Sequence, residues 1–194
     1  MVGIVLGAGA SRRLGRPKQT LPFGDTTLLG YVLREAEASA LERVVLVVGG
    51  SADDALAGAE PARATVARND SYGTGCASSL LAGLDAAGDT EAIMLMLGDM
   101  PGVGAATIDA VATAWERTRP WAAVTSYRSE RGHPFVFAQS AFGALRALHG
   151  DKAVWKLIEQ RPERVLEVPV DRALPRDVDT WDDYEAVLRE LSAA

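Results

Sequence analysis

Three short apolar runs, each followed by a glycine, constrain the fold of this chain more than any other feature. They are residues 2–6, 44–48 and 93–97. Each run is continuously apolar rather than alternating, which is typical of strands buried on both faces of a parallel sheet. Helical patterns separate the runs. This order predicts an α/β fold with right-handed crossovers and a doubly wound sheet covered by helices on both sides.

The remaining elements follow from local patterns. Thr26 or Thr27 can cap a helix that begins near Leu28, because a threonine oxygen accepts a bond from a free backbone N–H there. We further expect helices at 77–87, 107–118 and 181–191, a hairpin of strands at 122–127 and 134–137, and a late strand at 165–170. The chain has 194 residues without a linker, repeat or low-complexity segment, so we expect a single domain over residues 1–194.

Composition argues against several classes of function. The net charge is −6 and no segment is polybasic, so we expect no nucleic acid partner. No apolar run is long enough to span a bilayer, and the chain opens directly into a strand rather than a signal segment. Cys76 is the sole cysteine, which fits a reducing compartment. We therefore expect a cytoplasmic protein that does not bind membranes.

The string VGIVLGAGASRRLGRPK at residues 2–18 combines a strand, a glycine turn and several cations, and no acidic residue precedes Asp25. The cations are Arg12, Arg13, Arg16 and Lys18. Free N–H groups in a glycine loop and converging cations suit an anion with several phosphates. Neither common phosphate motif fits, because Arg12 replaces the third glycine of the dinucleotide fingerprint and Lys18 follows Pro17 rather than a glycine.

The same string resembles the signature L-x-x-G-x-S-x-R-x-G-x-x-K of MobA-like NTP transferases, which are related to molybdenum cofactor guanylyl- and cytidylyltransferases. Its fixed positions are Leu6, Gly9, Ser11, Arg13, Gly15 and Lys18. Gly-Arg-Pro-Lys at 15–18, Gly-His-Pro at 132–134 and Asp-Val-Asp-Thr at 177–180 make the resemblance closer to the cytidylyltransferases. It implies a Rossmann-like, mostly parallel sheet of the nucleotide-diphospho-sugar transferase type, with three α/β/α layers.

Asp99 follows the apolar run at 93–97 within the sequence Gly-Asp-Met-Pro. A carboxylate at such a place loses solvation unless it meets a cation or a metal. Opposite a triphosphate loop, Mg²⁺ is the natural partner because it binds a few carboxylates together with phosphate oxygens. The alternative is that Asp99 caps the next helix or starts a turn with Pro101. The motif also resembles the Gly-Asp-x-Pro of the same family, which implies the metal role.

The acidic segment at 177–184 gives a second candidate for the metal site. In an extended segment, alternation places Asp177 and Asp179 on the same side. Thr180 or Asp182 could cap the following helix, so part of this charge is structural. The segment resembles the D-[IV]-D-T-x-x-D-Y of cytidylyltransferase relatives. This implies Asp179, and secondarily Asp177, as the second metal carboxylate.

Residues 69–84 resemble the family segment that holds the nucleobase, which implies that role for Asn69, Ser78 and Ser79. Ordinary helix capping by either serine is the alternative. Cys76 lies in the same loop without an obvious neighbouring base, so we do not expect it to act as a nucleophile.

The resemblance implies that His133 and Asp151 contact the acceptor substrate. A lone histidine in a turn is more often structural, which leaves that alternative open for His133. The family commonly has Gly-Asp-x-Gly-Ala-Arg where this chain has Ala153 and Trp155 in place of the second glycine and the arginine. The acceptor pocket is therefore expected to differ.

The reaction implied is transfer of a nucleoside monophosphate from a Mg²⁺-bound triphosphate to a phosphorylated small-molecule acceptor such as molybdopterin cofactor. CTP is the first expectation and GTP the next. Arg13, Lys18 and Asp99 would be catalytic. The nucleotide-binding set implied is Leu6, Ala8, Gly9, Ala10, Ser11, Arg13, Lys18, Asn69, Ser78 and Ser79. Two alternatives stay open: a flavin- or NAD(P)H-linked oxidoreductase like nicotine blue oxidoreductase, and a non-catalytic nucleotide-binding protein.

Overall fold

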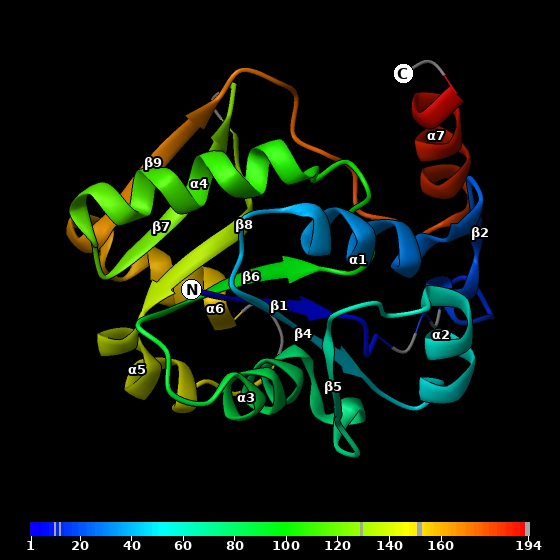
Figure 1. Ribbon diagram of the computed structural model, residues 1–194, viewed down its shortest axis with the longest axis horizontal. Helices are drawn as coiled ribbons and strands as arrows, with labels where there is room; N and C mark the ends of the chain where they lie inside the picture. The colour runs from blue at the N-terminus through cyan, green and yellow to red at the C-terminus, as the bar shows by residue number, and fades with distance from the viewer. Residues whose placement is uncertain (10, 12, 129, 151–152, 193–194) are drawn as a thin grey trace.

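The computed structural model describes residues 1–9, 11, 13–128, 130–150 and 153–192. Its centre is a seven-stranded sheet in the order β5-β4-β1-β6-β8-β7-β9 (Figure 1). The strands are β1 (Val2–Leu6), β4 (Arg43–Val48), β5 (Thr65–Arg68), β6 (Ala92–Leu97), β7 (Ala122–Tyr127), β8 (Glu130–Ala138) and β9 (Val165–Val170). Neighbouring strands pair in parallel except at β8, which is antiparallel to both β6 and β7. The mostly parallel sheet confirms the predicted fold class.

Helices cover both faces of this sheet. The helices that do so are α1 (Leu28–Ala38), α2 (Ala52–Ala59), α3 (Cys76–Ala87), α4 (Ala105–Thr118), α5 (Phe142–Arg146) and α6 (Ala153–Glu159), and a further helix, α7 (Trp181–Ser192), lies beside the sheet. Helices α1, α2 and α4 contribute to the hydrophobic cluster on one face, and α3, α5 and α6 contribute to the cluster on the other. The result is a three-layer α/β/α arrangement.

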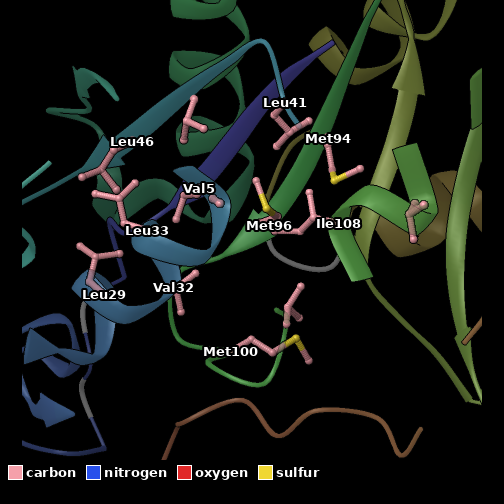
Figure 2. Packing of buried hydrophobic residues seen from close by; sticks show 14 of the residues in the cluster. Val5, Leu29, Val32, Leu33, Leu41, Leu46, Met94, Met96, Met100 and Ile108 are labelled. Carbon is pink, nitrogen blue, oxygen red and sulfur yellow. The ribbon is translucent and has the colours of Figure 1, made fainter. Parts of the chain in front are cut away.

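Strand β1 shows why its sequence is continuously apolar. Val5 belongs to the first cluster and Ile4 to the second, because successive side chains of a strand point to opposite faces. Figure 2 shows Val5 among Leu29, Val32 and Leu33 of α1 and Met96 of β6. Because helices cover both sides of the sheet, the side chains on both faces of this strand are apolar and largely buried.

A third, smaller cluster lies beside the sheet. It joins Leu14, Leu21, Phe23, Leu28, Val178 and Val187. Through it, the loop after β1, the small hairpin of β2 (Pro22–Phe23) and β3 (Thr26–Thr27), and helix α7 pack together. Helix α7 is thereby held next to the segment that follows β1, as the neighbouring α7 and β2 of Figure 1 show.

Most of the expected elements are present. Thr27 caps α1, because its Oγ1 accepts a bond of 3.2 Å from the Gly30 N–H. Helix α3 ends at Gly88, which has a φ of +64° that favours glycine. The expected hairpin exists, with β8 beginning earlier than predicted, at Glu130. The sequence did not predict β5, α2, α5 or α6. In the described part of the chain, no helix is long and apolar enough to cross a membrane.

Candidate active site

A cavity of about 520 Å³ lies at the carboxyl ends of β1 and β6. Open parallel sheets bind ligands at this edge, because the loops that follow the strands converge there. Its walls come from the loop after β1, the 3₁₀ turn η1 (Lys18–Thr20), the turn η2 (Tyr72–Thr74) with the start of α3, the end of β6 and Asp179. Leu6, Ala8, Gly9, Ser11, Arg13, Lys18, Ser79 and Asp99 all line it, as does Asp179.

Lys18 lies at the centre of the charges in this cavity. Its side chain is largely buried, and its Nζ forms an ion pair with Asp99 Oδ2 and a second one, of 2.9 Å, with Asp179 Oδ1. Arg13 approaches Asp179 Oδ2 from the solvent side at 2.7 Å. Two acidic residues that are 80 positions apart in the sequence thus share one lysine ammonium group.

The pKa values of this cluster follow from its burial and its pairing. Burial alone lowers the pKa of Lys18, but the charges and hydrogen bonds of Asp99 and Asp179 outweigh burial and raise it. Burial alone raises the pKa of Asp179, but Lys18 and Arg13 outweigh it and lower the pKa. Lys18 and Asp179 are therefore charged at neutral pH.

Two side-chain contacts give the loop after β1 its shape. The backbone N–H of Lys18 donates to Ser11 Oγ at 2.9 Å, and Gln19 Nε2 donates to the carbonyl oxygen of Gly9 at 2.8 Å. Ser11 has a φ of +48°, in the left-handed region. Gln19 is buried, and the sequence did not indicate its role, because its only signal is its position next to Lys18.

Asp99 carries the one unusual polar atom of the site. Among the described residues, its Oδ1 is the buried side-chain oxygen or nitrogen without a hydrogen-bond partner. A buried carboxylate oxygen in this condition is costly unless a cation completes it. The set of oxygen donors formed by Asp99 and Asp179 suits a hard divalent cation that draws its other ligands from a substrate. The described residues contain no cluster of three acidic, cysteine or histidine side chains that would enclose a metal unaided.

The segment after β9 positions Asp179. Val178 is fully buried in the third cluster, and its N–H donates to the Asp99 carbonyl oxygen at 3.0 Å. Thr180 then caps α7, since its Oγ1 accepts from the Asp183 N–H at 3.2 Å and its own N–H donates to Asp183 Oδ2 at 2.9 Å. Asp177 is exposed and does not belong to the cavity lining, although the sequence pattern grouped it with Asp179.

Asn69 connects the two serines that were expected to hold a nucleobase. It is buried, and its Nδ2 donates to Ser78 Oγ and Ser79 Oγ at 3.0 Å each. Its Oδ1 accepts from the Ser71 N–H at 2.9 Å. Ser79 lines the cavity, whereas Asn69 and Ser78 support its wall from behind. The three residues thus shape the loop that faces the cavity.

Tyr72 is a cavity residue that the sequence motifs did not single out. Its partly exposed ring lines the cavity and lies against the backbone of Gly49 and Gly50. A Cβ at Gly50 would collide with the tyrosine hydroxyl, so the glycine pair after β4 makes room for the ring. Two consecutive glycines indicate that another group packs closely against the backbone, but the sequence does not show that this group is Tyr72, which lies in another loop.

His133 lies outside the cavity lining, buried in the sheet. Its Nδ1 lies 3.2 Å from the Leu95 carbonyl oxygen and therefore carries the hydrogen, and its ring stacks on Phe135 at 3.9 Å between centroids. Burial lowers the pKa of His133 to about 4, although the Leu95 carbonyl and the charge of Asp177 act to raise it. Ala10, Arg12 and Asp151 lie outside the described residues.

The amino-acid sequence matches the model of a known protein family. Residues 3–165 match the MobA-like NTP transferase domain. The chain belongs to this family. This MobA-like transferase is thus an enzyme of the nucleotidyltransferase type, as its sequence motifs predicted.

Two curated relatives of this MobA-like transferase differ in their stated activities. Nicotine blue oxidoreductase of Paenarthrobacter nicotinovorans is 33% identical over 198 residues, covering 97% of this chain and 96% of the relative. Molybdenum cofactor cytidylyltransferase of Escherichia coli K12 is 28% identical over 137 residues, covering 70% of this chain and 69% of the relative.

Solved structures extend the comparison. The crystal structure of Rv0371c from Mycobacterium tuberculosis H37Rv is 40% identical, with a TM-score of 0.87 and 97% of each chain covered. A structure of Rv0371c in complex with manganese is 37% identical, with a TM-score of 0.80 and 97% of each chain covered. CMP:2-keto-3-deoxy-manno-octonic acid synthetase complexed with CTP is 13% identical, with a TM-score of 0.77 and 99% and 98% covered, and it shares the fold.

Proposed function

We propose that this transferase moves a nucleoside monophosphate from a Mg²⁺-bound nucleoside triphosphate to a phosphorylated small-molecule acceptor and releases pyrophosphate. We propose CMP first and GMP next as the transferred group, and a molybdopterin-type cofactor as the acceptor class. One observation carries the proposal. Lys18 and Arg13 meet Asp99 and Asp179 over a single cavity that is formed by a glycine loop.

The cations of the cavity are placed for a triphosphate. Lys18 and Arg13 follow β1, and Ala8, Gly9 and Ser11 of the same loop line the cavity with them. Cations and loop N–H groups together favour an anion with several phosphate groups. We assign Arg13 and the loop to the β- and γ-phosphates, and Lys18 to the α-phosphate.

Asp99 and Asp179 would hold the divalent cation. The unpaired, buried Oδ1 of Asp99 supports this assignment, and so does the manganese complex of Rv0371c, which is 37% identical. When bound, the ion would neutralise phosphate charge and favour departure of pyrophosphate. Asp177 is exposed, and we keep it as a secondary candidate only.

The chemistry needs no general base. An oxygen of the acceptor phosphate, already anionic, forms a new bond to the α-phosphorus as the bond from that phosphorus to the oxygen bridging to the β-phosphate breaks. The electron pair of that bond leaves with pyrophosphate. Lys18 stabilises the charge that develops on the α-phosphate oxygens, and Arg13 orients the leaving group. The enzyme contributes through positioning and through charge.

The base and the acceptor are assigned from the motifs and from the walls of the cavity. CTP is favoured by the cytidylyltransferase-like motifs and by the E. coli molybdenum cofactor cytidylyltransferase, at 28% identity. We assign the wall formed by Ser79 and Tyr72 to the base, and we keep His133 and Asp151 as the candidates for acceptor contacts that the motifs imply. Trp155 stands where the family commonly has an arginine, so an indole ring replaces a cation at this position. The ring lies 4.8 Å from that of Phe135 and 6.4 Å from that of His133, between centroids.

Thermal unfolding with a panel of ligands tests the proposal. CTP, GTP, ATP and UTP would each be added with and without Mg²⁺, next to flavins and nicotinamide cofactors. We expect a shift that depends on the metal and is largest for CTP. At about a hundred times its dissociation constant, a ligand adds roughly 2.7 kcal/mol to the free energy of unfolding. A shift with flavin or nicotinamide cofactors alone would instead support the activity named for the P. nicotinovorans relative.

A matched pair of variants makes the panel specific. Asp99→Asn should abolish the metal-dependent part of the shift. Asp85→Asn makes the same chemical change at an exposed carboxylate on α3 that pairs with Arg146, outside the cavity, and should preserve it. Pyrophosphate release with a phosphorylated pterin acceptor then separates an enzyme from a nucleotide-binding protein that does not turn over.

A further inference from the structure

The Lys18 ammonium group lies between the two carboxylates that the proposed function assigns to a metal. Its Nζ forms ion pairs with Asp99 Oδ2 and, at 2.9 Å, with Asp179 Oδ1. These are one oxygen from each carboxylate of the pair. An ammonium group at this place and a divalent ion bound by the same oxygens exclude each other, because both need the same lone pairs. Two cations at such a distance also repel strongly in a site sheltered from water.

The stem of Lys18 allows its charge to move while the loop stays in place. The Lys18 backbone N–H is tied to Ser11 Oγ at 2.9 Å, and the turn η1 begins at this residue. Beyond Cα, a lysine has a flexible chain of four carbons with a compact charge at its end. The side chain can therefore turn from the carboxylates toward the cavity that the loop lines, without a change in the backbone.

Arg13 does not occupy the position between the two carboxylates. Its side chain is 68% exposed and, among the described residues, forms an ion pair with Asp179 alone, at 2.7 Å. The Lys18 side chain is 11% exposed and pairs with both carboxylates. The buried position between the carboxylates thus belongs to the lysine, and the arginine screens one carboxylate from outside.

We propose that Lys18 serves as the resident cation of the nucleotide-free enzyme and excludes divalent metal until a triphosphate draws its ammonium group away. This inference rests on the proposed function for the identity of the ligands. In this sequence of events the phosphates bind Lys18, the two carboxylates become available, and the metal enters with the nucleotide rather than before it. The Oδ1 of Asp99, which is buried without a hydrogen-bond partner, is a further oxygen that the metal can bind.

Binding of Mn²⁺ in the absence of nucleotide tests the exclusion. Electron paramagnetic resonance counts free Mn²⁺ during a titration. We expect Lys18→Met to bind Mn²⁺ at least about tenfold more tightly than the natural enzyme, a difference of about 1.4 kcal/mol. Lys156→Met removes the same charge from an exposed position on α6 and should leave the affinity unchanged. Arg13→Met should give a smaller gain than Lys18→Met. Equal or weaker binding by Lys18→Met overturns the inference.

A second measurement uses the natural enzyme and needs no variant to fold. Reductive methylation with formaldehyde and a borohydride modifies lysine amines, and peptide mass spectrometry gives the rate at each lysine. We expect Lys18 to react slowly in the free enzyme and faster at saturating Mn²⁺, because the metal displaces it, while the rate at Lys156 stays constant. An unchanged or slower reaction of Lys18 with Mn²⁺ overturns the inference.

The two hypotheses fail in different ways. If Mg²⁺ and CTP bind together and pyrophosphate is released, but Lys18→Met gains no affinity for Mn²⁺, the proposed function stands and the exclusion is wrong. If Lys18→Met binds Mn²⁺ more tightly but none of the triphosphates shifts the unfolding temperature, the competition between lysine and metal is real and the proposed function is wrong.

Discussion

The backbone N–H of Val178 donates a hydrogen bond of 3.0 Å to the backbone carbonyl oxygen of Asp99. This bond joins the end of β6 to the segment that runs from β9 to α7 across the carboxyl edge of the sheet. Since Val178 is also fully buried, the segment is held from both its backbone and its side chain. The carboxylates of Asp99 and Asp179 are thereby placed relative to each other by the polypeptide itself.

Gly102 gives a way to move this segment without touching a charge. A Cβ at Gly102 would lie 2.7 Å from Pro175 Cβ, which is too close, and Pro175 is buried. We expect Gly102→Ala to displace the segment that carries Asp179, to lower the free energy of unfolding by about 1–3 kcal/mol and to reduce turnover by roughly tenfold or more. Guanidinium unfolding and the rate of pyrophosphate release measure the two effects.

The control for this substitution is Gly143→Ala. Gly143 lies in α5, and a Cβ there would meet nothing within 4 Å. Because alanine favours a helix over glycine, we expect unchanged turnover and equal or slightly greater stability. Equal losses in both variants would show that the position of the segment does not matter for turnover.

Lys18→Ala addresses the chemical step. Because the proposed role of Lys18 is to stabilise charge that develops on the α-phosphate, we expect kcat to fall by roughly 10²–10³ and the KM for the triphosphate to change by much less. Steady-state kinetics with Lys156→Ala as the control measures this. A loss that appears equally in affinity and turnover would reduce Lys18 to a binding residue.

The sequence predicted the half of the fold whose strands are buried on both faces. Residues 2–6, 44–48 and 93–97 are continuously apolar because helices cover each of them on both sides, and a short apolar run followed by glycine is typical of such strands. Strand β5 was missed because it lies at the edge of the sheet and is mostly exposed, so Thr65–Arg68 has no apolar run. Helices α2, α5 and α6 are short, and their apolar stripes are too brief to indicate a period.

The site could be predicted in part, because its residues come from motifs at strand ends. Topology brings those ends together, so the glycine loop after residues 2–6 and Asp99 are predicted to lie at one edge of the sheet. Two features were beyond such reasoning. The contact of Lys18 with both carboxylates depends on a rotamer. Alternation along the segment predicted Asp177 and Asp179 on one side, yet only Asp179 of the two lines the cavity, and Asp177 is exposed.

Asn69→Ala tests the wall behind the predicted base site. The substitution removes the donor to Ser78 and Ser79 and leaves the Ser71 N–H without its acceptor. We expect the free energy of unfolding to fall by about 1–3 kcal/mol and the KM for the triphosphate to rise, because the loop that lines the cavity loses its support. Thermal unfolding and nucleotide titration check the two effects.

Asn69→Asp is the matched variant for this wall. It keeps an oxygen that accepts from the Ser71 N–H but offers no donor to the two serines. We expect a loss of stability of similar size, since a charge would be placed in a buried position, together with an increase in KM. A KM that stays at its natural value in both variants would contradict a role of this wall in nucleotide binding.

His133 makes stability depend on pH. Burial lowers the pKa of its imidazole in the folded protein to about 4, against 6.5 for an ordinary histidine. Between these values the unfolded chain binds a proton at this residue and the folded protein does not, so stability falls as the pH decreases through that range. From pH 7 to pH 5, we expect His133 to remove about 2 kcal/mol from the free energy of unfolding. Urea unfolding at several pH values measures it.

His133→Asn isolates this contribution. The asparagine amide offers a donor toward the Leu95 carbonyl, which now accepts from Nδ1 at 3.2 Å, but it does not titrate. The variant should be less stable at pH 7, because it loses the stacking on Phe135, and its stability should change less between pH 7 and pH 5. His149→Asn, at an exposed histidine, should keep the full pH dependence. If the slope of stability against pH is the same for His133→Asn as for the natural protein, the buried imidazole is not the group responsible.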